Sequence, residues 1–257
     1  MTDADLATTA DHARRLGVRV HLHASENPQQ AASSLASRGI TPIQVLAETG
    51  ILDAGTIIAH GAGIVADDLR WLVPVADRVG VASCTKVYLK HAQRGTTPVR
   101  MLHDAGITVG VGTDGPASHN TLDVLESIRF LSLSEKDQHG DATWLTSAHA
   151  LDLATRQSAD LFGQGDRLGA LLPGYRADIA LLDLAGPHLQ PLHDLPAALV
   201  LSVKSTDVRT VLVDGRVVVR DGRLTTLDLR DTIAELSARM PQLRDTSHGT
   251  RIQEYAP

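Results

Sequence analysis

Four short β-rich runs alternate with helical segments over the first two-thirds of the chain, and this alternation restricts the fold to the α/β class. The runs cover residues 18–23, 56–60, 80–84 and 107–111. Strands that alternate with helices are typical of parallel βα units. The sequence therefore predicts four parallel strands connected by helices.

Residues that favour helix ends place the connecting helices. Thr41 is a suitable N-cap before Pro42, and we expect that helix to run to Leu52. Apolar residues at helical spacing predict a second helix over 69–79. Pro98 opens a third helix, and Gly106 ends it. Two further helices are expected at about 121–133 and 146–162.

After residue 163 the pattern changes to short strands and tight turns. Residues 177–183 predict one strand, and residues 208–213 and 216–220 predict two arms of a hairpin around Asp214-Gly215. A terminal helix is expected near 232–240. We therefore divide the chain into an α/β unit, residues 1–163, and a small β unit with a terminal helix, residues 164–257.

The composition excludes several classes of protein. The 257 residues are 43% hydrophobic and 21% charged, which is ordinary for a globular protein. No apolar run approaches the roughly 20 residues of a spanning helix, and the start lacks the features of a signal peptide. The single cysteine excludes an intrachain disulfide, and a net charge of −6 without a basic cluster argues against nucleic-acid binding. We expect a cytoplasmic protein with no membrane or nucleic-acid partner.

Polar residues follow three of the four predicted strands. His23 and Glu26 follow the first, His60 ends the second, and Asp114 follows the fourth. In parallel βα architectures the carboxyl ends of the strands carry the site, because the following loops converge there. Imidazole and carboxylate groups bind Zn²⁺ or Fe²⁺, and such a metal lowers the pKa of its bound water to about 7. The pattern predicts a metal-dependent hydrolytic site.

Each of these residues also has an ordinary structural interpretation. A single histidine such as His23 or His60 is more often packed in a core. Asp114 lies in a Thr-Asp-Gly sequence that suits a turn, and Glu26 could be a solvated loop carboxylate. For Ser118, four residues after Asp114, the two interpretations are evenly balanced. The ordered series of polar strand ends favours the functional interpretation for His23, Glu26, His60 and Asp114.

Taken in order, these residues resemble the amidohydrolase superfamily, in its branch of chlorohydrolases, cytosine deaminases and adenosine-derivative deaminases. The resemblance covers almost the whole chain. It is carried by the His-x-x-Glu of His23 and Glu26 and by residues 59–61, 89–90, 97–100, 112–120, 168–183 and 207–216. It implies that the four strands are the fifth to eighth of a (β/α)8 TIM-type barrel. The residues after 163 would form part of a small β-sandwich.

The resemblance also implies a reaction and a set of roles. The family's chemistry here would be hydrolysis of a carbon–nitrogen bond other than a peptide bond, as in deamination of a purine, pyrimidine or triazine heterocycle. His23 and Asp114 would bind one divalent metal, with zinc favoured over iron. Asp114 would also take the proton of the attacking water, and Glu26 would pass a proton to the ring nitrogen. His60 would contact the metal-bound hydroxide or the substrate, and Ser118 would hold the site around the aspartate.

The chain departs from the family in ways that leave the function open. Residues 84–88 read Cys-Thr-Lys-Val-Tyr where the family has a proline and small polar residues, and His119 stands where asparagine is usual. Lys86 and Lys90 could steer an anionic or carbonyl-bearing substrate, or be solvated. The rival functions are a chloro-heterocycle hydrolase and a non-catalytic α/β module that binds a ligand or completes an oligomer. An open α/β protein unrelated to the family is a third alternative.

The metal-binding His-x-His of the family's first strand has no convincing counterpart. His21 and His23 have this spacing, but too few residues separate them from Asp114 for seven further βα units. We therefore expect the first four strands and the opening half of the β domain to be absent, through a wrong start, a degraded gene or a second chain that completes the barrel. The expected partners are a small heterocyclic substrate and a second copy or completing chain, and we expect the chain to be inactive alone.

Overall fold

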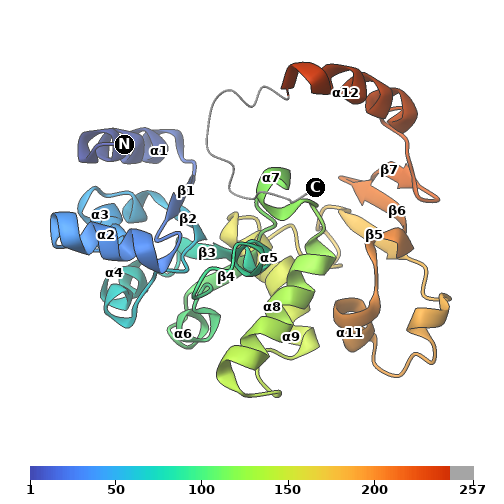
Figure 1. The fold of residues 1–257 in the computed structure, drawn as a ribbon, viewed down its shortest axis with the longest axis horizontal. Coiled ribbons are helices and arrows are strands. Elements are labelled where there is room, and N and C mark those ends of the chain that lie inside the picture. Colours follow the sequence, from blue (N-terminus) through green and yellow to red (C-terminus); the bar gives the residue numbers. More distant parts are fainter. Residues whose placement is uncertain (244–257) are drawn as a thin grey trace.

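The computed structural model describes residues 1–243 and contains a parallel four-stranded sheet with flanking helices (Figure 1). Its strands lie in sequence order: β1 (Val20–Ala24), β2 (Thr56–His60), β3 (Val79–Ser83) and β4 (Thr108–Val111). Each adjacent pair is parallel, so all four carboxyl ends lie at one edge of the sheet. This confirms the α/β class, and each predicted strand agrees with the structure to within two residues.

Helices connect these strands and cover the sheet. They are α1 (Asp3–Leu16), α2 (Pro28–Arg38), α3 (Pro42–Glu48), α4 (Leu69–Leu72), α5 (Thr85–Lys90), α6 (Val99–Asp104), α7 (Pro116–His119), α8 (Val124–His139), α9 (Ser147–Asp152) and α10 (Ser158–Leu161). The Thr41 hydroxyl accepts a hydrogen bond from the Gln44 amide at 3.1 Å, so the predicted N-cap of α3 is confirmed. This cap fixes the residue at which α3 begins.

Two helix predictions were too long. The helix that begins at Pro42 ends at Glu48 instead of Leu52, because the chain turns at Gly50 with a φ of 75°. The predicted 69–79 helix stops at Leu72, where a 3₁₀ turn contains Pro74, a residue with no amide hydrogen for a helix interior. The helix expected at about 146–162 is confirmed in extent, because a π turn, Leu153–Gln157, joins α9 to α10 without a break.

The main core lies between the parallel sheet and its helices. All five residues of β2 are buried, as are four of the five residues of β3. Glycine lets α10 approach closely, because a Cβ on Gly80 would lie 2.5 Å from a Leu161 methyl and one on Gly110 would lie 2.8 Å from the other. Val200 and Val203, from much later in the chain, are also fully buried. The core therefore draws on residues beyond the first 163.

A second sheet follows and is antiparallel. Its strands, in order, are β5 (Ile179–Leu182), β6 (Val208–Val213), β7 (Arg216–Arg220) and β8 (Arg223–Leu224). Asp214 and Gly215 both have positive φ angles, 49° and 77°, as the central residues of a type I′ turn require. The predicted hairpin is confirmed. A short helix, α11 (Leu195–Ala197), lies between β5 and β6 in the chain.

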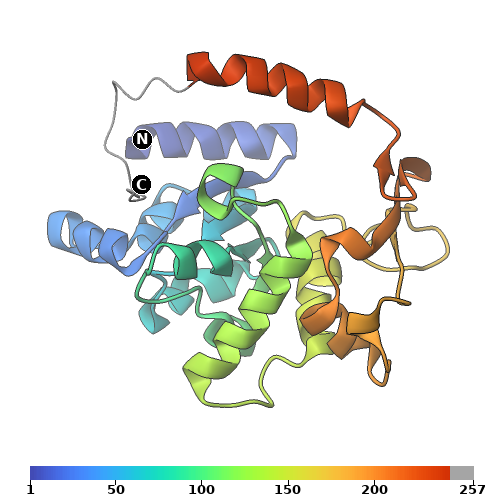
Figure 2. The same ribbon diagram turned by 45° about the vertical axis from the view of Figure 1, so that its right-hand side comes forward.

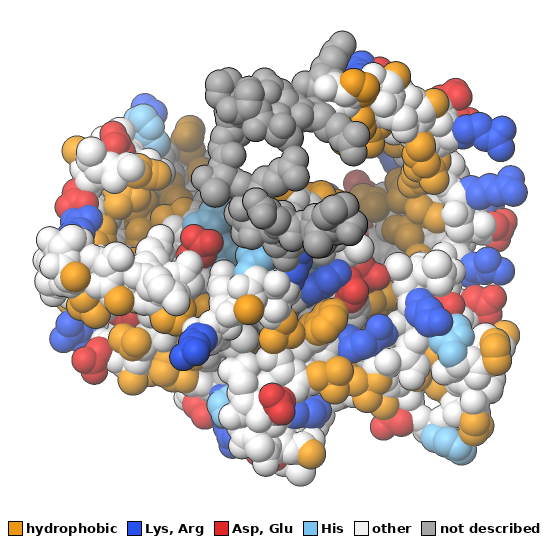
Figure 3. Space-filling view, viewed as in Figure 1, with side chains coloured by type: hydrophobic (Ala, Val, Ile, Leu, Met, Phe, Trp, Pro, Cys, Tyr) orange, Lys and Arg blue, Asp and Glu red, His pale blue; other side chains and the backbone are white. Residues whose placement is uncertain are grey.

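Helix α12 (Leu229–Leu243) includes the predicted terminal helix and runs across the top of the molecule in the view of Figure 2, above α1. Its apolar side chains are exposed, as the hydrophobic colour over this helix in Figure 3 shows. They are Leu229, Ile233, Leu236 and Met240. Residues 244–257 of the predicted C-terminal unit lie outside the described residues. Among residues 1–243 no helix is long and apolar enough to span a bilayer.

Candidate active site

The predicted site residues are gathered at the carboxyl edge of the parallel sheet. His23 lies within the last two residues of β1, His60 is the last residue of β2, and Asp114 follows β4. Three residues at this edge have left-handed backbone, with φ angles of 46° at Ser25, 70° at His60 and 62° at Asp114. Non-glycine residues adopt this conformation rarely, and such residues cluster at functional sites.

His23 and His60 lie next to each other across the β1–β2 pair. His60 is opposite Ala24 in the register, one residue beyond His23. The centroids of the two imidazole rings are 5.0 Å apart, with 35° between the ring planes. His23 is exposed and His60 is buried, so one imidazole of the pair is open to solvent and the other lies in the protein interior.

The His60 imidazole lies in a buried environment that keeps it neutral. Its side-chain Nδ1 is buried and has no hydrogen-bond partner among the described residues. Burial is the largest influence and lowers the pKa of His60, while the Asp114 carboxylate raises it and His23 lowers it. A neutral imidazole can coordinate a metal or accept a hydrogen bond.

Asp114 is held by the turn that follows β4. One of its carboxylate oxygens accepts a hydrogen bond from the Gly115 amide at 2.6 Å, and the Thr113 hydroxyl donates to its carbonyl at 2.9 Å. Its charge also reaches Cys84, because burial and then Asp114 raise the pKa of the Cys84 thiol to about 12. The Cys84 thiol therefore stays protonated at neutral pH.

Glu26 lies on the loop between β1 and α2. Its amide donates to the Gln30 side chain at 2.7 Å, and the Asn27 side chain caps α2 by accepting from the Gln30 amide at 2.8 Å. The carboxylate is partly buried, and its charge raises the pKa of His60. Because Glu26 follows closely on the end of β1, it lies at the same edge of the sheet as His23 and His60.

Ser118 contacts the neighbouring helix through its backbone. Its carbonyl, in α7, accepts a hydrogen bond from the Lys90 ammonium at 2.8 Å. Lys86 forms an ion pair with Glu126 at 2.5 Å and also donates to Thr121 at 3.3 Å. Both lysines of α5 therefore hold the loop and helices that follow β4. This differs from both interpretations of the sequence, in which they steer a substrate or are simply solvated.

The sequence analysis missed two residues that contact His60. The hydroxyl groups of Tyr88 and Thr97 lie 3.3 and 2.6 Å from the His60 carbonyl oxygen. The sequence held two signals: residues 84–88 depart from the family pattern and place Tyr88 shortly after the end of β3, and Thr97 lies in the stretch 97–100 that carries the family resemblance. Hydrophobic spacing alone does not indicate which hydroxyl reaches which carbonyl.

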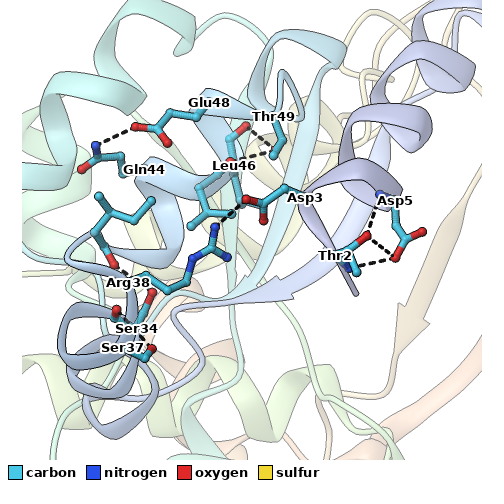
Figure 4. Close-up of polar contacts among 12 residues, drawn as sticks. Thr2, Asp3, Asp5, Ser34, Ser37, Arg38, Gln44, Leu46, Glu48 and Thr49 are labelled. Carbon is cyan, nitrogen blue, oxygen red and sulfur yellow. Dashed lines mark hydrogen bonds and ion pairs between the residues drawn. The ribbon is translucent and has the colours of Figure 1, made fainter.

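A groove of about 670 Å³ lies along the outer side of β1. Its walls come from α1, α2, α3 and β1 itself, and include Leu6, His21, His23 and Val45. The ion pair between Arg38 and Asp3, 2.6 Å apart, joins α2 to α1 beside this groove (Figure 4). Within residues 1–243, β1 pairs with β2 alone, so the groove follows an unpaired strand edge.

The side chains at this edge are of the types that bind a divalent metal, but too few of them lie close together. His23, His60 and Asp114 offer the imidazole and carboxylate ligands that zinc prefers, and the buried Nδ1 of His60 is free to accept. However, no group of three or more His, Cys, Asp or Glu side chains in residues 1–243 lies close enough together to hold a metal ion. A catalytic zinc usually has three protein ligands, so residues 1–243 do not make up such a shell by themselves.

Comparison with protein families shows to which family the chain belongs. A model of the amidohydrolase family matches residues 1–218. The chain belongs to the amidohydrolase family. This confirms the resemblance inferred from the ordered histidine, glutamate and aspartate residues, and it explains why they meet at the carboxyl ends of parallel strands.

Curated amidohydrolases similar to the chain include 5-methylthioadenosine/S-adenosylhomocysteine deaminases. The one from Pelotomaculum thermopropionicum is 40% identical over 210 residues, which are 82% of this chain and 48% of that protein. The one from Natronomonas pharaonis is 38% identical over 219 residues, 84% of this chain and 49% of that protein. The chain spans about half the length of the curated relatives it matches.

Solved amidohydrolase structures share the fold. An adenosine deaminase from Xanthomonas campestris with bound zinc matches with a TM-score of 0.89 and 30% identity, over 95% of this chain and 55% of that one. The atrazine chlorohydrolase TrzN from Arthrobacter aurescens, complexed with zinc, gives 0.84 and 31%, over 93% and 52%. Their names connect this half-length fold with deaminases and with a chlorohydrolase.

Proposed function

We propose that the chain forms half of an amidohydrolase barrel in an enzyme that hydrolytically deaminates an aminated heterocycle of the purine, pyrimidine or triazine type. Residues 1–163 contribute strands five to eight, and residues 164–257 contribute part of the β-sandwich. The observation that carries the proposal is the meeting of His23, a buried neutral His60 and Asp114 at one sheet edge. The similarity to named deaminases supports the choice of reaction.

The metal of this enzyme is zinc, held in part by His23 and Asp114. When bound, it makes a water molecule acidic enough to attack at neutral pH. The zinc in the two solved relatives supports this choice of ion. The remaining ligands come from the half of the barrel that this chain does not span, since residues 1–243 offer fewer than a catalytic zinc requires.

The chain's own residues move the protons of the reaction. Asp114 takes a proton from the attacking water, and Glu26 gives one to the ring nitrogen next to the carbon under attack. The neutral His60 imidazole orients the water or the substrate. The amine leaves as ammonia with the proton that Asp114 took from the water, and the proton of the added hydroxyl returns to Glu26 as the carbonyl product forms. Ser118 holds the loop that carries Asp114. This division meets the general acid–base requirements of hydrolytic deamination.

A strand from the rest of the barrel pairs with the free edge of β1, along the groove described above. An unpaired parallel strand edge next to an apolar groove is costly to leave in water and favours another strand. The partner is the complementary half of an amidohydrolase, supplied upstream in the same polypeptide or by a separate chain, and a second copy of this chain is the alternative. The chain alone is therefore inactive.

A complementation assay tests the proposal. The purified 257-residue chain is assayed for ammonia release from 5′-methylthioadenosine, adenosine and aminated triazines with added zinc. It is assayed alone and mixed with the half of the Pelotomaculum relative that it does not match. We expect turnover only in the mixture, and loss of at least about 1,000-fold in kcat for Asp114→Asn, because the water loses its proton acceptor.

The matched control is Asp137→Asn, which removes an exposed carboxylate from α8 and should leave turnover unchanged. Turnover by the chain alone would disprove the requirement for a partner. A mixture that assembles and binds zinc but releases no ammonia from any of these substrates would refute deamination.

A chloro-heterocycle hydrolase is the second candidate, favoured by the 31% identity with atrazine chlorohydrolase. The same proton acceptor serves both reactions, since only the leaving group differs. Chloride release from atrazine by the mixture, without ammonia from the aminated substrates, would establish this reaction in place of deamination.

A further inference from the structure

The backbone at His60 reverses direction in a conformation that histidine does not favour. His60 and Gly61 have consecutive positive φ angles of 70° and 61°, and the Gly61 amide donates back to the Ala59 carbonyl at 3.1 Å. A Cβ on Gly61 would lie 2.8 Å from methyl groups of both Ile64 and Val81. A non-glycine residue remains in this region only when its surroundings impose it, so the contacts of His60 determine where its imidazole points.

Three buried groups form one directed series of hydrogen bonds that ends on the His60 carbonyl. The Thr97 hydroxyl donates to that oxygen at 2.6 Å. Its own oxygen lies 3.1 Å from the Tyr88 hydroxyl, which in turn accepts from the Cys84 amide at 3.0 Å. Each hydroxyl has one proton to give. With one proton per donor, the shortest contacts therefore run in one direction: the Cys84 amide donates to Tyr88, the Tyr88 hydroxyl donates to Thr97, and the Thr97 hydroxyl donates to the His60 carbonyl.

Burial restricts the hydroxyl groups of this series to partners within the protein, and the alternative for Tyr88, a direct bond to the His60 carbonyl, is longer at 3.3 Å. Tyr88 is 1% exposed and Thr97 is fully buried, so water does not replace a missing partner. Burial also raises the pKa of Tyr88, so the phenol keeps the proton that it donates. The Tyr88 ring meets the His60 imidazole edge-on, with centroids 5.8 Å apart. Tyr88 therefore contacts both the backbone and the ring of His60.

We propose that Tyr88 and Thr97 are positioning residues that fix the left-handed His60 and so aim its imidazole at the reaction site. The role of His60 in catalysis rests on the proposed function, whereas the constraint on its backbone does not.

Conservative variants separate the hydroxyl groups from the packing around them. Thr97→Val and Tyr88→Phe each remove one hydroxyl and keep the shape of the side chain, and Thr97→Ser keeps the hydroxyl. Thr56→Val is the matched control, because Thr56 is also fully buried and donates to a backbone carbonyl, that of Ile51, at 2.6 Å. Tyr175→Phe, which loses a 2.8 Å bond to Gly165, is the control for tyrosine.

The measurement is multidimensional NMR of the labelled full chain, without metal or substrate. The Cα and Cβ shifts of His60 and the coupling between its amide and α protons report the φ angle directly. We expect these signals to leave the left-handed range in Thr97→Val, to shift partly in Tyr88→Phe and to be restored in Thr97→Ser. Exchange of the Cys84 amide should be about tenfold faster in Tyr88→Phe, since its acceptor is gone.

The controls decide between positioning and general stability. Thr56→Val and Thr97→Val should lower the melting temperature by similar amounts, but only Thr97→Val should move the His60 signals. Unchanged His60 signals in both Thr97→Val and Tyr88→Phe would overturn the proposal. If Thr97→Val does not fold, the contrast between Tyr88→Phe and Tyr175→Phe still decides it. The NMR result stands whether or not the assembled enzyme deaminates, so the two proposals fail separately.

Discussion

The two sheets have the same number of strands but very different surroundings. In the parallel sheet β2 is buried throughout and β3 nearly so, whereas no residue of β5, β6, β7 or β8 is fully buried. Parallel strands need cover on both faces, and helices provide it. The antiparallel sheet is only partly covered within residues 1–243.

This difference indicates where stability and chemistry reside. The candidate site residues all follow strands of the buried sheet, where tight packing can impose left-handed backbone at His60 and Asp114. The second sheet carries none of them and ends in the exposed helix α12. A substitution should therefore cost more in the first sheet than the same substitution in the second.

The largest expected contrast compares one substitution in each sheet. Ile58 in β2 is fully buried, and Ile179 in β5 is half-buried. Ile58→Ala should lower the free energy of unfolding by about 4 kcal/mol, through lost burial and a cavity, and Ile179→Ala by about 1 kcal/mol. Urea unfolding of both variants measures this. Equal losses would show that the second sheet is as tightly packed as the first.

A smaller contrast comes from adding a methyl group. Gly110→Ala in β4 would place a Cβ 2.8 Å from a Leu161 methyl, and overpacking of this kind costs about 2 kcal/mol of unfolding free energy. Gly215→Ala in the hairpin has free space but a φ of 77°, so it should cost about 1 kcal/mol. Thermal unfolding of the two variants tests this order. A reversal would mean that α10 moves aside easily.

The next test measures how stability depends on pH through His119, a buried histidine at the end of α7. His119 is fully buried, with its ring nitrogens 2.9 Å from Thr121 and 3.1 Å from Ser127. Burial and then Lys86 lower the pKa of His119, although Glu126 and Asp123 raise it. The folded chain therefore binds fewer protons than the unfolded chain near the ordinary histidine pKa. The free energy of unfolding should fall as the pH falls through that range.

Variants assign this pH dependence to one side chain. His119→Gln should reduce the loss of stability between pH 7.5 and 5.5, whereas His193→Gln, at an exposed loop position before β6, should leave the loss unchanged. Denaturant unfolding at the two pH values measures both. A loss of the same size in wild type and His119→Gln would show that other groups cause it.

The smallest effect is expected on α12. Ile233 is 55% exposed, so Ile233→Asn should change the free energy of unfolding by no more than about 0.5 kcal/mol. Leu131→Asn, at a buried position of α8, is the opposite control and should be severely destabilising. A large loss in Ile233→Asn, measured by urea unfolding, would show that α12 packs against something in solution.

Periodicity and turn chemistry in the sequence were enough to locate the strands and the hairpin. Alternating strands and helices fixed the parallel order, and Asp214-Gly215 fixed the turn, because both depend on neighbours in the chain. The same logic brought His23, His60 and Asp114 to one edge. In each case a short stretch of sequence determines where the neighbouring residues lie.

Contacts between distant residues could not be predicted in this way. Val200 enters the first core from far along the chain, and the series from Cys84 to His60 depends on how three loops meet. His119 is buried because Ser127 and Thr121 satisfy both its nitrogens, and nothing in its immediate sequence requires that. Long-range packing decided these positions.

The order of the parallel strands has a consequence for how the protein is made. Each strand pairs with the next one along the chain, so every pairing partner of a new strand has already been synthesised. Within these four strands, the sheet can therefore grow by addition at one edge while the ribosome is still translating. Until residues near Val200 emerge, α8 and α9 lack part of their apolar cover, and exposed surface of this kind favours aggregation.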